Sequence, residues 1–138
     1  MKKIFYSLII LPIIFIVSCT EKNDIVTPYS NTPVVAYTQN AFAYTLAANN
    51  YTSTFSYDVS FNSDSLAYSL VVSGYKSGDG VLTVFMEPQS SYAYSEQLKS
   101  NKVISFTQNG VGTPRKVQLE FNNFSGSISF SLARSNGN

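Results

Sequence analysis

Apolar and polar residues alternate along most of the chain after Val34, which is the pattern of half-buried β-strands. In the clearest run, residues 54–61 (TFSYDVSF), aromatic and aliphatic side chains fall on one face and polar side chains on the other. Such runs predict strands over 34–38, 41–46, 51–61, 66–72, 81–86, 103–107, 117–121 and 128–132. The alanines of 41–48 would also permit a helix, but the alternation of Phe42, Tyr44 and Leu46 favours a strand.

Turn-forming residues separate these runs and predict how the strands are joined. We expect Gln39-Asn40 to form a two-residue hairpin, and Asn62–Ser65 to join its two flanking strands as an antiparallel pair. We also expect a tight hairpin at Ser77–Gly80 and a hairpin loop at Asn122–Ser127, with Gly126 available for a bulge. Turn signals every 8 to 12 residues predict an all-β fold, an antiparallel β-sandwich of about eight strands.

The motifs between Gly80 and Leu132 (GVLTV, VQLEF and FSGSISF) loosely resemble the jelly-roll modules of secreted bacterial proteins. Strand spacing alone leaves jelly-roll and immunoglobulin-like connectivity both open. Eight tyrosines and eight phenylalanines after Pro33 can fill the core of such a sandwich without disulfides.

The N-terminus carries a separate signal. Lys2 and Lys3 precede an apolar run from Ile4 to Val17, which is shorter than the roughly 20 residues of a membrane span. The run ends in Ile16-Val17-Ser18-Cys19, which resembles the lipobox of bacterial lipoproteins. The resemblance implies cleavage before Cys19 and a diacylglycerol on its thiol, so the protein would be exported and anchored by palmitate-type acyl chains. The alternative is a free or disulfide-bonded cysteine after an ordinary signal peptide or an N-terminal membrane helix.

We therefore divide the chain into a signal peptide (1–18), a lipidated N-terminus and tether (19–33) and a β-sandwich domain (34–138). A docked strand around Ile25-Val26 is the alternative to a plain tether. We expect a location in the cell envelope, on the outer rather than the inner membrane.

Charge and composition narrow the chemistry. Without residues 1–18 the chain carries seven Lys and Arg against eight Asp and Glu, a balance that argues against a nucleic-acid partner. The chain has no histidine, and its one cysteine would be consumed by lipid, so we expect no catalytic triad, metal or cofactor. Ser73 and Lys76 match a Ser-x-x-Lys spacing, but Gly74 and the strand context remove the helical turn that this motif needs. A small hydrolase with paired carboxylates is the remaining enzymatic alternative.

The segment from Glu87 to Asn101 interrupts the strand pattern, and we expect a long irregular loop with a possible helical turn at Ser95–Lys99. Tyr92 and Tyr94 lie in this segment and Tyr75 lies beside another predicted turn. Tyrosine can stack on the apolar face of a sugar, so these three are the candidate ligand-binding residues. The alternative, which we favour, is that they cover sheet edges or pack back onto the core. We expect a lipid-anchored, non-catalytic binding or assembly module, with a glycan or an envelope protein as its partner, and a carbohydrate-binding module as the alternative.

Overall fold

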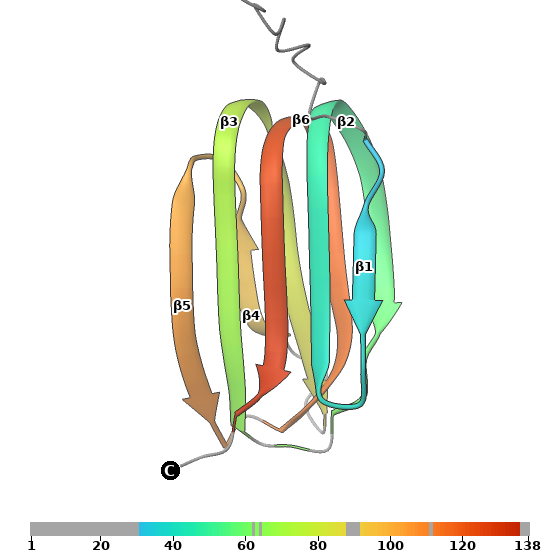
Figure 1. The fold of residues 1–138 in the computed structure, drawn as a ribbon, viewed down its shortest axis with the longest axis vertical. Helices are drawn as coiled ribbons and strands as arrows, with labels where there is room; N and C mark the ends of the chain where they lie inside the picture. The colour runs from blue at the N-terminus through green and yellow to red at the C-terminus, as the bar shows by residue number, and fades with distance from the viewer. Residues whose placement is uncertain (1–30, 62, 64, 88–91, 111, 136–138) are drawn as a thin grey trace, which may run out of the picture.

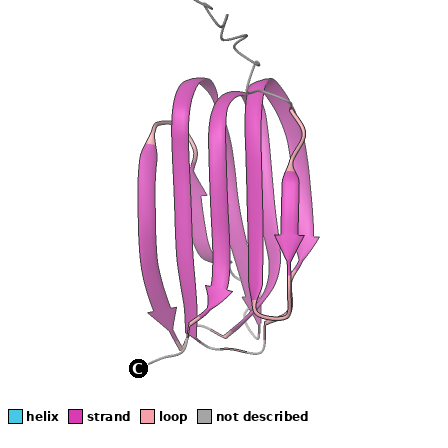
Figure 2. Cartoon of the chain, viewed as in Figure 1, coloured by secondary structure: helices cyan, strands magenta, loops and turns pink. Residues whose placement is uncertain are grey.

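A computed structural model describes residues 31–61, 63, 65–87, 92–110 and 112–135. Within these residues the chain forms six antiparallel strands joined by short loops (Figures 1 and 2). They are β1 (Val34–Tyr37), β2 (Ala41–Asp58), β3 (Ser65–Glu87), β4 (Tyr92–Gln97), β5 (Lys102–Asn109) and β6 (Thr113–Arg134). The described residues contain no helix that is long and apolar enough to cross a membrane.

Three long strands, β2, β3 and β6, each fold over at one end of the molecule, seen at the top of Figure 1. Residues 41–48 of β2 pair with 126–133 of β6, and residues 53–58 of β2 pair with 116–121 of the same strand. β3 follows β6 in the same way through both of its halves. One set of pairings therefore builds both layers of an antiparallel β-sandwich.

The two layers have different borders. The first layer has the order β1, first half of β2, second half of β6, first half of β3, and β5. The second layer has the order second half of β2, first half of β6, second half of β3, and β4. The second half of β2 is thus a border strand, because among the described residues it pairs only with β6.

Backbone conformations that favour Gly and Asn form the corners where the long strands change layer. Asn50 in β2 and Asn123 in β6 have φ of 50°, and Gly78 in β3 has φ of 79°. The strand registers shift at the same places, between Ala48 and Tyr51 and between Ser73 and Asp79. Each corner is therefore an irregularity inside a paired strand, as in a β-bulge, and not a loop.

The core lies between the layers and is rich in aromatic residues, as predicted. Its largest fully buried side chains include Tyr44, Phe42, Phe61, Phe124 and Phe130. Phe42, Tyr44 and Phe130 alternate with exposed or half-buried neighbours in the sequence, so the two-residue period placed them correctly. Phe124 lies instead in the segment predicted as a hairpin loop, where the buried Ser125 follows it.

Asn31 joins the sandwich at its folded end, next to the β2 corner. Its backbone N–H donates to the Ala47 carbonyl (3.1 Å), and its side chain accepts from the Asn49 N–H (2.7 Å) and donates to the Asn49 carbonyl (3.2 Å). The last residues of the predicted tether are therefore bonded to the domain.

Several predicted connections are wrong, although the all-β sandwich is confirmed. The described residues form six strands and not about eight, because three pairs of predicted strands are continuous through their corners and β4 adds a strand that was not predicted. Ser77–Gly80 and Asn122–Ser127 are corners rather than hairpins, although Gly126, with φ of 156°, does lie at an irregularity. The runs on either side of Asn62–Ser65 do not pair, because the second half of β2 belongs to the second layer and the first half of β3 to the first layer.

Two further predictions concern shorter segments. The Gln39-Asn40 hairpin is confirmed, with the Thr38 N–H donating to the Ala41 carbonyl at 2.7 Å. The segment 87–101 is not a continuous irregular loop, because β4 occupies Tyr92–Gln97 and pairs with β3. There is also no helical turn at 95–99, where strand pairing continues to Gln97 and the Leu98 N–H donates to the Gly80 carbonyl.

The corner geometry predicts a large difference between two glycine substitutions. A Cβ on Gly78 would lie 2.1 Å from the Asn123 carbonyl oxygen, whereas a Cβ on Gly110 would meet nothing within 4 Å. Both glycines have positive φ, so each Gly→Ala change carries a conformational cost of about 1–2 kcal/mol. We expect Gly110→Ala to lose only that amount in urea unfolding and Gly78→Ala to lose clearly more. Equal losses would show that the close approach of the β3 and β6 corners is not needed for stability.

Candidate binding edge

The three tyrosines singled out in the sequence do not gather on one surface. Tyr75 lies at the β3 corner, where its hydroxyl donates to the Gly78 carbonyl (2.7 Å) and its ring packs on Phe124 (6.1 Å between centroids). Tyr94 lies in β4, with its ring against Tyr68 (5.3 Å) and Phe106 (5.2 Å). Tyr92 is paired in register with Phe85, and its side chain lies outside the described part of the chain. Their role in ligand binding stays a prediction, but Tyr75 and Tyr94 both serve packing.

One long side of the sandwich, between β4 and β5, is bridged by a lysine. The Lys102 ammonium contacts the Glu96 carboxylate at 2.7 Å and donates to the Gln97 carbonyl at 2.7 Å. The side chains of Lys102 and Glu96 are about three-quarters buried, with 21% and 25% of their surfaces exposed. We call this side the closed edge, because a charged pair and the ring contact of Tyr94 with Phe106 join its two layers.

The opposite long side, between β1 and the second half of β2, has a different character. Tyr51, Phe55 and Tyr57 of β2 are half-buried and form a row of rings packed against the core. The ring centroids of Tyr51 and Phe55 are 6.3 Å apart and those of Phe55 and Tyr57 are 6.2 Å apart. The angle between the ring planes is 19° for Tyr51 and Phe55 and 9° for Phe55 and Tyr57. We call this side the open edge.

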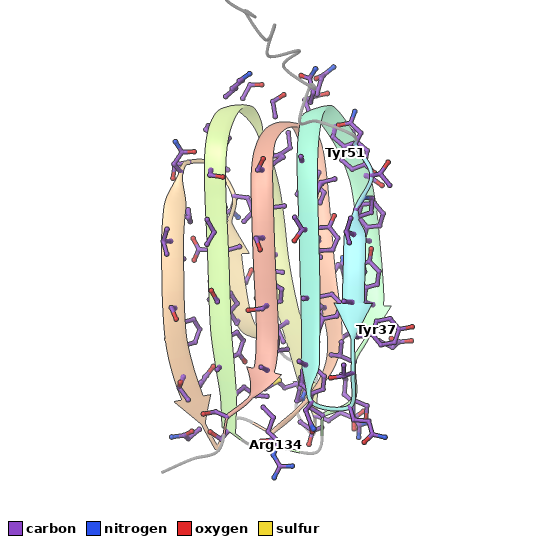
Figure 3. The ribbon with its side chains drawn as sticks, in the orientation of Figure 1. Tyr37, Tyr51 and Arg134 are labelled. Atoms are coloured by element: carbon purple, nitrogen blue, oxygen red, sulfur yellow. The ribbon has the colours of Figure 1, made fainter. Side chains whose placement is uncertain are left out.

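Tyr37 extends the open edge. It is the last residue of β1 and is 71% exposed, unusually high for a large apolar side chain. Figure 3 shows its side chain projecting from the same side of the molecule on which Tyr51 lies. The open edge therefore carries aromatic surface along much of its length.

The core behind the open edge holds tyrosine hydroxyls in apolar surroundings. Tyr44 contacts Phe55 and Tyr57 (6.2 and 6.0 Å between centroids), and its buried hydroxyl has no hydrogen-bond partner among the described residues. Burial raises the pKa of Tyr44, with smaller contributions from Tyr57 and Tyr51. Burial and the neighbouring Tyr51 also raise the pKa of Tyr57. Both phenols therefore stay neutral at physiological pH, and their rings pack on neighbouring aromatic side chains.

The closed edge has a similar buried pair. The hydroxyls of Tyr68 and Tyr94 are buried without partners in the described part of the chain. Burial raises the pKa of Tyr68 to about 12, and burial followed by Glu96 and Tyr68 raises the pKa of Tyr94 to about 12. An unpartnered buried hydroxyl costs about 1–3 kcal/mol.

Carboxylates and possible metal ligands do not assemble among the described residues. No group of three or more His, Cys, Asp and Glu side chains there could hold a metal ion. Glu87 is paired with Arg115 at 2.8 Å and Glu96 with Lys102. Ser73 and Lys76 lie in β3, beside Gly74 at φ of 59°, so they lack the helical turn of a Ser-x-x-Lys site, as expected.

Comparisons with known proteins give distant structural likenesses only. No protein-family model matches the sequence, and no curated protein matches it. A solved structure described as "Bacillus endospore appendages form a novel family of disulfide-linked pili" has a TM-score of 0.43 and 12% identity, covering 75% of this chain and 90% of that one. A CBM4 structure has a TM-score of 0.41 and 9% identity, covering 75% and 78%. CsCBM6-3 from Clostridium stercorarium, in complex with cellobiose, has a TM-score of 0.34 and 11% identity, covering 75% and 94%.

The placement of Tyr94 predicts opposite effects of two substitutions. Tyr94→Ala removes a ring that packs on Tyr68 and Phe106, so we expect a loss of about 3 kcal/mol or more in the free energy of unfolding. Tyr94→Phe keeps the ring and removes an unpartnered hydroxyl, so we expect unchanged or slightly raised stability. Urea unfolding of the two variants beside the parent measures both effects. A stable Tyr94→Ala variant would contradict the packing role and return Tyr94 to the list of surface binding residues.

Proposed function

We propose that this protein is a lipid-anchored cell-envelope protein whose β-sandwich is a non-catalytic binding or assembly module. The lipobox-like Ile16-Val17-Ser18-Cys19 supports the anchor, and the open edge supports the binding role. The observation that carries the binding role is the row of half-buried rings of Tyr51, Phe55 and Tyr57. Stacking surfaces and neutral phenols are groups that bind a partner rather than move protons.

The anchor would restrict where the partner can be. Residues 20–30 span at most roughly 40 Å even when fully extended, and Asn31 is bonded to the folded end of the sandwich. The open edge would then work within a short distance of the bilayer. Partners would be components of the envelope or molecules that reach its surface, and the outer membrane is our proposed location.

A glycan is the second candidate partner, and the near-parallel rings of the open edge favour it. Aromatic rings can cover the apolar faces of sugars while phenol hydroxyls and hydroxylated side chains form hydrogen bonds. The proposed glycan surface would be the open edge, with Tyr51, Phe55, Tyr57 and Tyr37, rather than the predicted group of Tyr75, Tyr92 and Tyr94.

The anchor is tested by Cys19→Ala. We expect this variant to lose incorporation of radiolabelled palmitate and to accumulate as a precursor that retains residues 1–18, because the thiol is the lipid acceptor in the proposed pathway. Parent protein in the same cells is the control, and intact-mass measurement of both proteins shows whether residues 1–18 have been removed. Equal labelling of parent and variant would end the anchor proposal.

The glycan candidate is tested by Tyr57→Leu, which keeps an apolar side chain against the core and removes an aromatic face. Migration through gels containing neutral polysaccharides measures the affinity. If a glycan binds at the open edge, we expect this variant to bind about 0.5–1.5 kcal/mol more weakly, the range for an aromatic contact. Tyr94→Phe, which alters a tyrosine in β4, is the matched control and should bind like the parent. An unretarded parent across the polysaccharide series would remove the glycan candidate.

A further inference from the structure

The border strand of the second layer is regular over residues 53–58 and, among the described residues, pairs on one side only. The Val59 N–H donates to the Arg115 carbonyl (2.8 Å), so residues 59 and 115 form a hydrogen-bonded pair. Such pairs alternate along antiparallel strands, which makes Tyr57–Val117 and Phe55–Leu119 hydrogen-bonded pairs as well. The N–H and C=O groups of Thr54, Ser56 and Asp58 must then point away from β6, toward the open edge.

The other border strand of the second layer, β4, differs because a lysine side chain lies against its outward backbone groups. The Leu98 N–H donates to the Gly80 carbonyl, so the alternation directs the backbone groups of Gln97 and Ser95 outward. The Lys102 ammonium donates to one of these outward groups, the Gln97 carbonyl, at 2.7 Å, so this carbonyl already has a hydrogen-bond partner. An inserted lysine is a common means of preventing a sheet edge from pairing with another chain. The described part of the open edge has no such lysine, since residues 51–58 contain one charged side chain, that of Asp58.

We propose that the second half of β2 pairs with the same strand of a second copy of this chain, in antiparallel register, to join two second layers into one continuous sheet. This inference rests on the proposed binding role of the open edge and names its partner. It turns the module into an assembly module. Adding a strand to an open edge is an established mode of protein recognition, in which backbone hydrogen bonds supply affinity and neighbouring side chains supply specificity.

The sequence of residues 52–58 (TSTFSYD) is complementary to itself in this arrangement. With Phe55 on the two-fold axis, Thr54 faces Ser56 of the second copy, and these hydroxylated residues form hydrogen-bonded pairs. Phe55 faces Phe55 of the second copy at a non-hydrogen-bonded position, where side chains approach most closely and aromatic pairs are favourable. Asp58 faces Thr52, so the two carboxylates lie about 20 Å apart and do not repel.

Cysteine pairs test this register in the full chain in its membrane. In a hydrogen-bonded pair the Cα atoms are about 5.5 Å apart, within the range that a disulfide spans. We expect Thr54→Cys/Ser56→Cys to form a disulfide-linked dimer on mild oxidation, seen in a non-reducing gel. The matched control is Thr45→Cys/Ser105→Cys, which places two cysteines at exposed positions on the first layer, and it should stay monomeric. Equal dimer in both variants, or none in the first, would overturn the proposal.

A second variant removes the dependence on engineered cysteines. Thr54→Lys/Ser56→Lys places like charges opposite each other in the proposed dimer, while Thr45→Lys/Ser105→Lys adds the same charge elsewhere. Sedimentation equilibrium of the detergent-solubilised proteins at high protein concentration should show dimers for the parent and the control and monomers for the first variant. Because circular dichroism and urea unfolding report the fold of each variant, a misfolded variant is recognised and the parent result alone then decides.

The remaining outcomes separate this inference from the proposed function. A monomeric parent that is retarded by a polysaccharide overturns the strand pairing and leaves a glycan-binding module. If the parent is monomeric and a variant without residues 20–30 is dimeric, the chain's own N-terminal segment occupies the open edge. That outcome also overturns the pairing between copies. A monomeric parent that binds no polysaccharide removes both the pairing and the support for a binding role at the open edge.

Discussion

The fold-over of β2, β3 and β6 at one end of the molecule is the constraint on which the rest of the structure depends (Figure 1). Three strands that stay paired while they turn must all change layer at the same height, so their corners are mutually dependent. Gly78 shows this most directly, because the space for a side chain there is filled by the Asn123 backbone of the neighbouring corner. The same three strands are therefore neighbours in both layers, and the inward faces of both meet in a single core.

The open edge is a consequence of the same connectivity. Because β6 lies at the centre, β2 and β3 flank it in both layers, and only the short strands can cover the borders. β1 and β5 both join the first layer, whereas β4 alone joins the second. The second half of β2 consequently has no neighbour on one side in the described structure. Its aromatic row is only half-buried because no further strand extends the layer beneath the rings.

Local sequence patterns predicted which side chains point inward but not which strands are neighbours. Phe55 and Tyr57 were correctly placed on one face because side-chain direction depends only on alternation. Ser77–Gly80 looked like a hairpin because hairpins and corners both use residues that tolerate positive φ, which Gly78 adopts here, and only pairing with the distant β6 distinguishes them. Tyr94 was assigned to a loop because Tyr92-Ala93-Tyr94 is too short to show a period. The open edge left a signal, the uncharged run TSTFSY, but its exposure depends on where β1 begins relative to the β2 corner.

Membrane attachment and strand pairing would reinforce each other if both proposals hold. The pairing adds a few backbone hydrogen bonds, each worth about 0.5–1.5 kcal/mol net, and a pair of aromatic contacts. That is a modest gain to set against the loss of rotational and translational freedom on association, so the free domain would dimerise weakly in dilute solution. Two copies held in one membrane have already lost much of that freedom, and a short tether keeps their open edges at a similar height above the bilayer. Tethering raises the effective concentration of one edge near another without any new contact. Weak strand pairing at the open edge would then suffice for assembly on the envelope, and the precursor would not associate before it reaches the membrane.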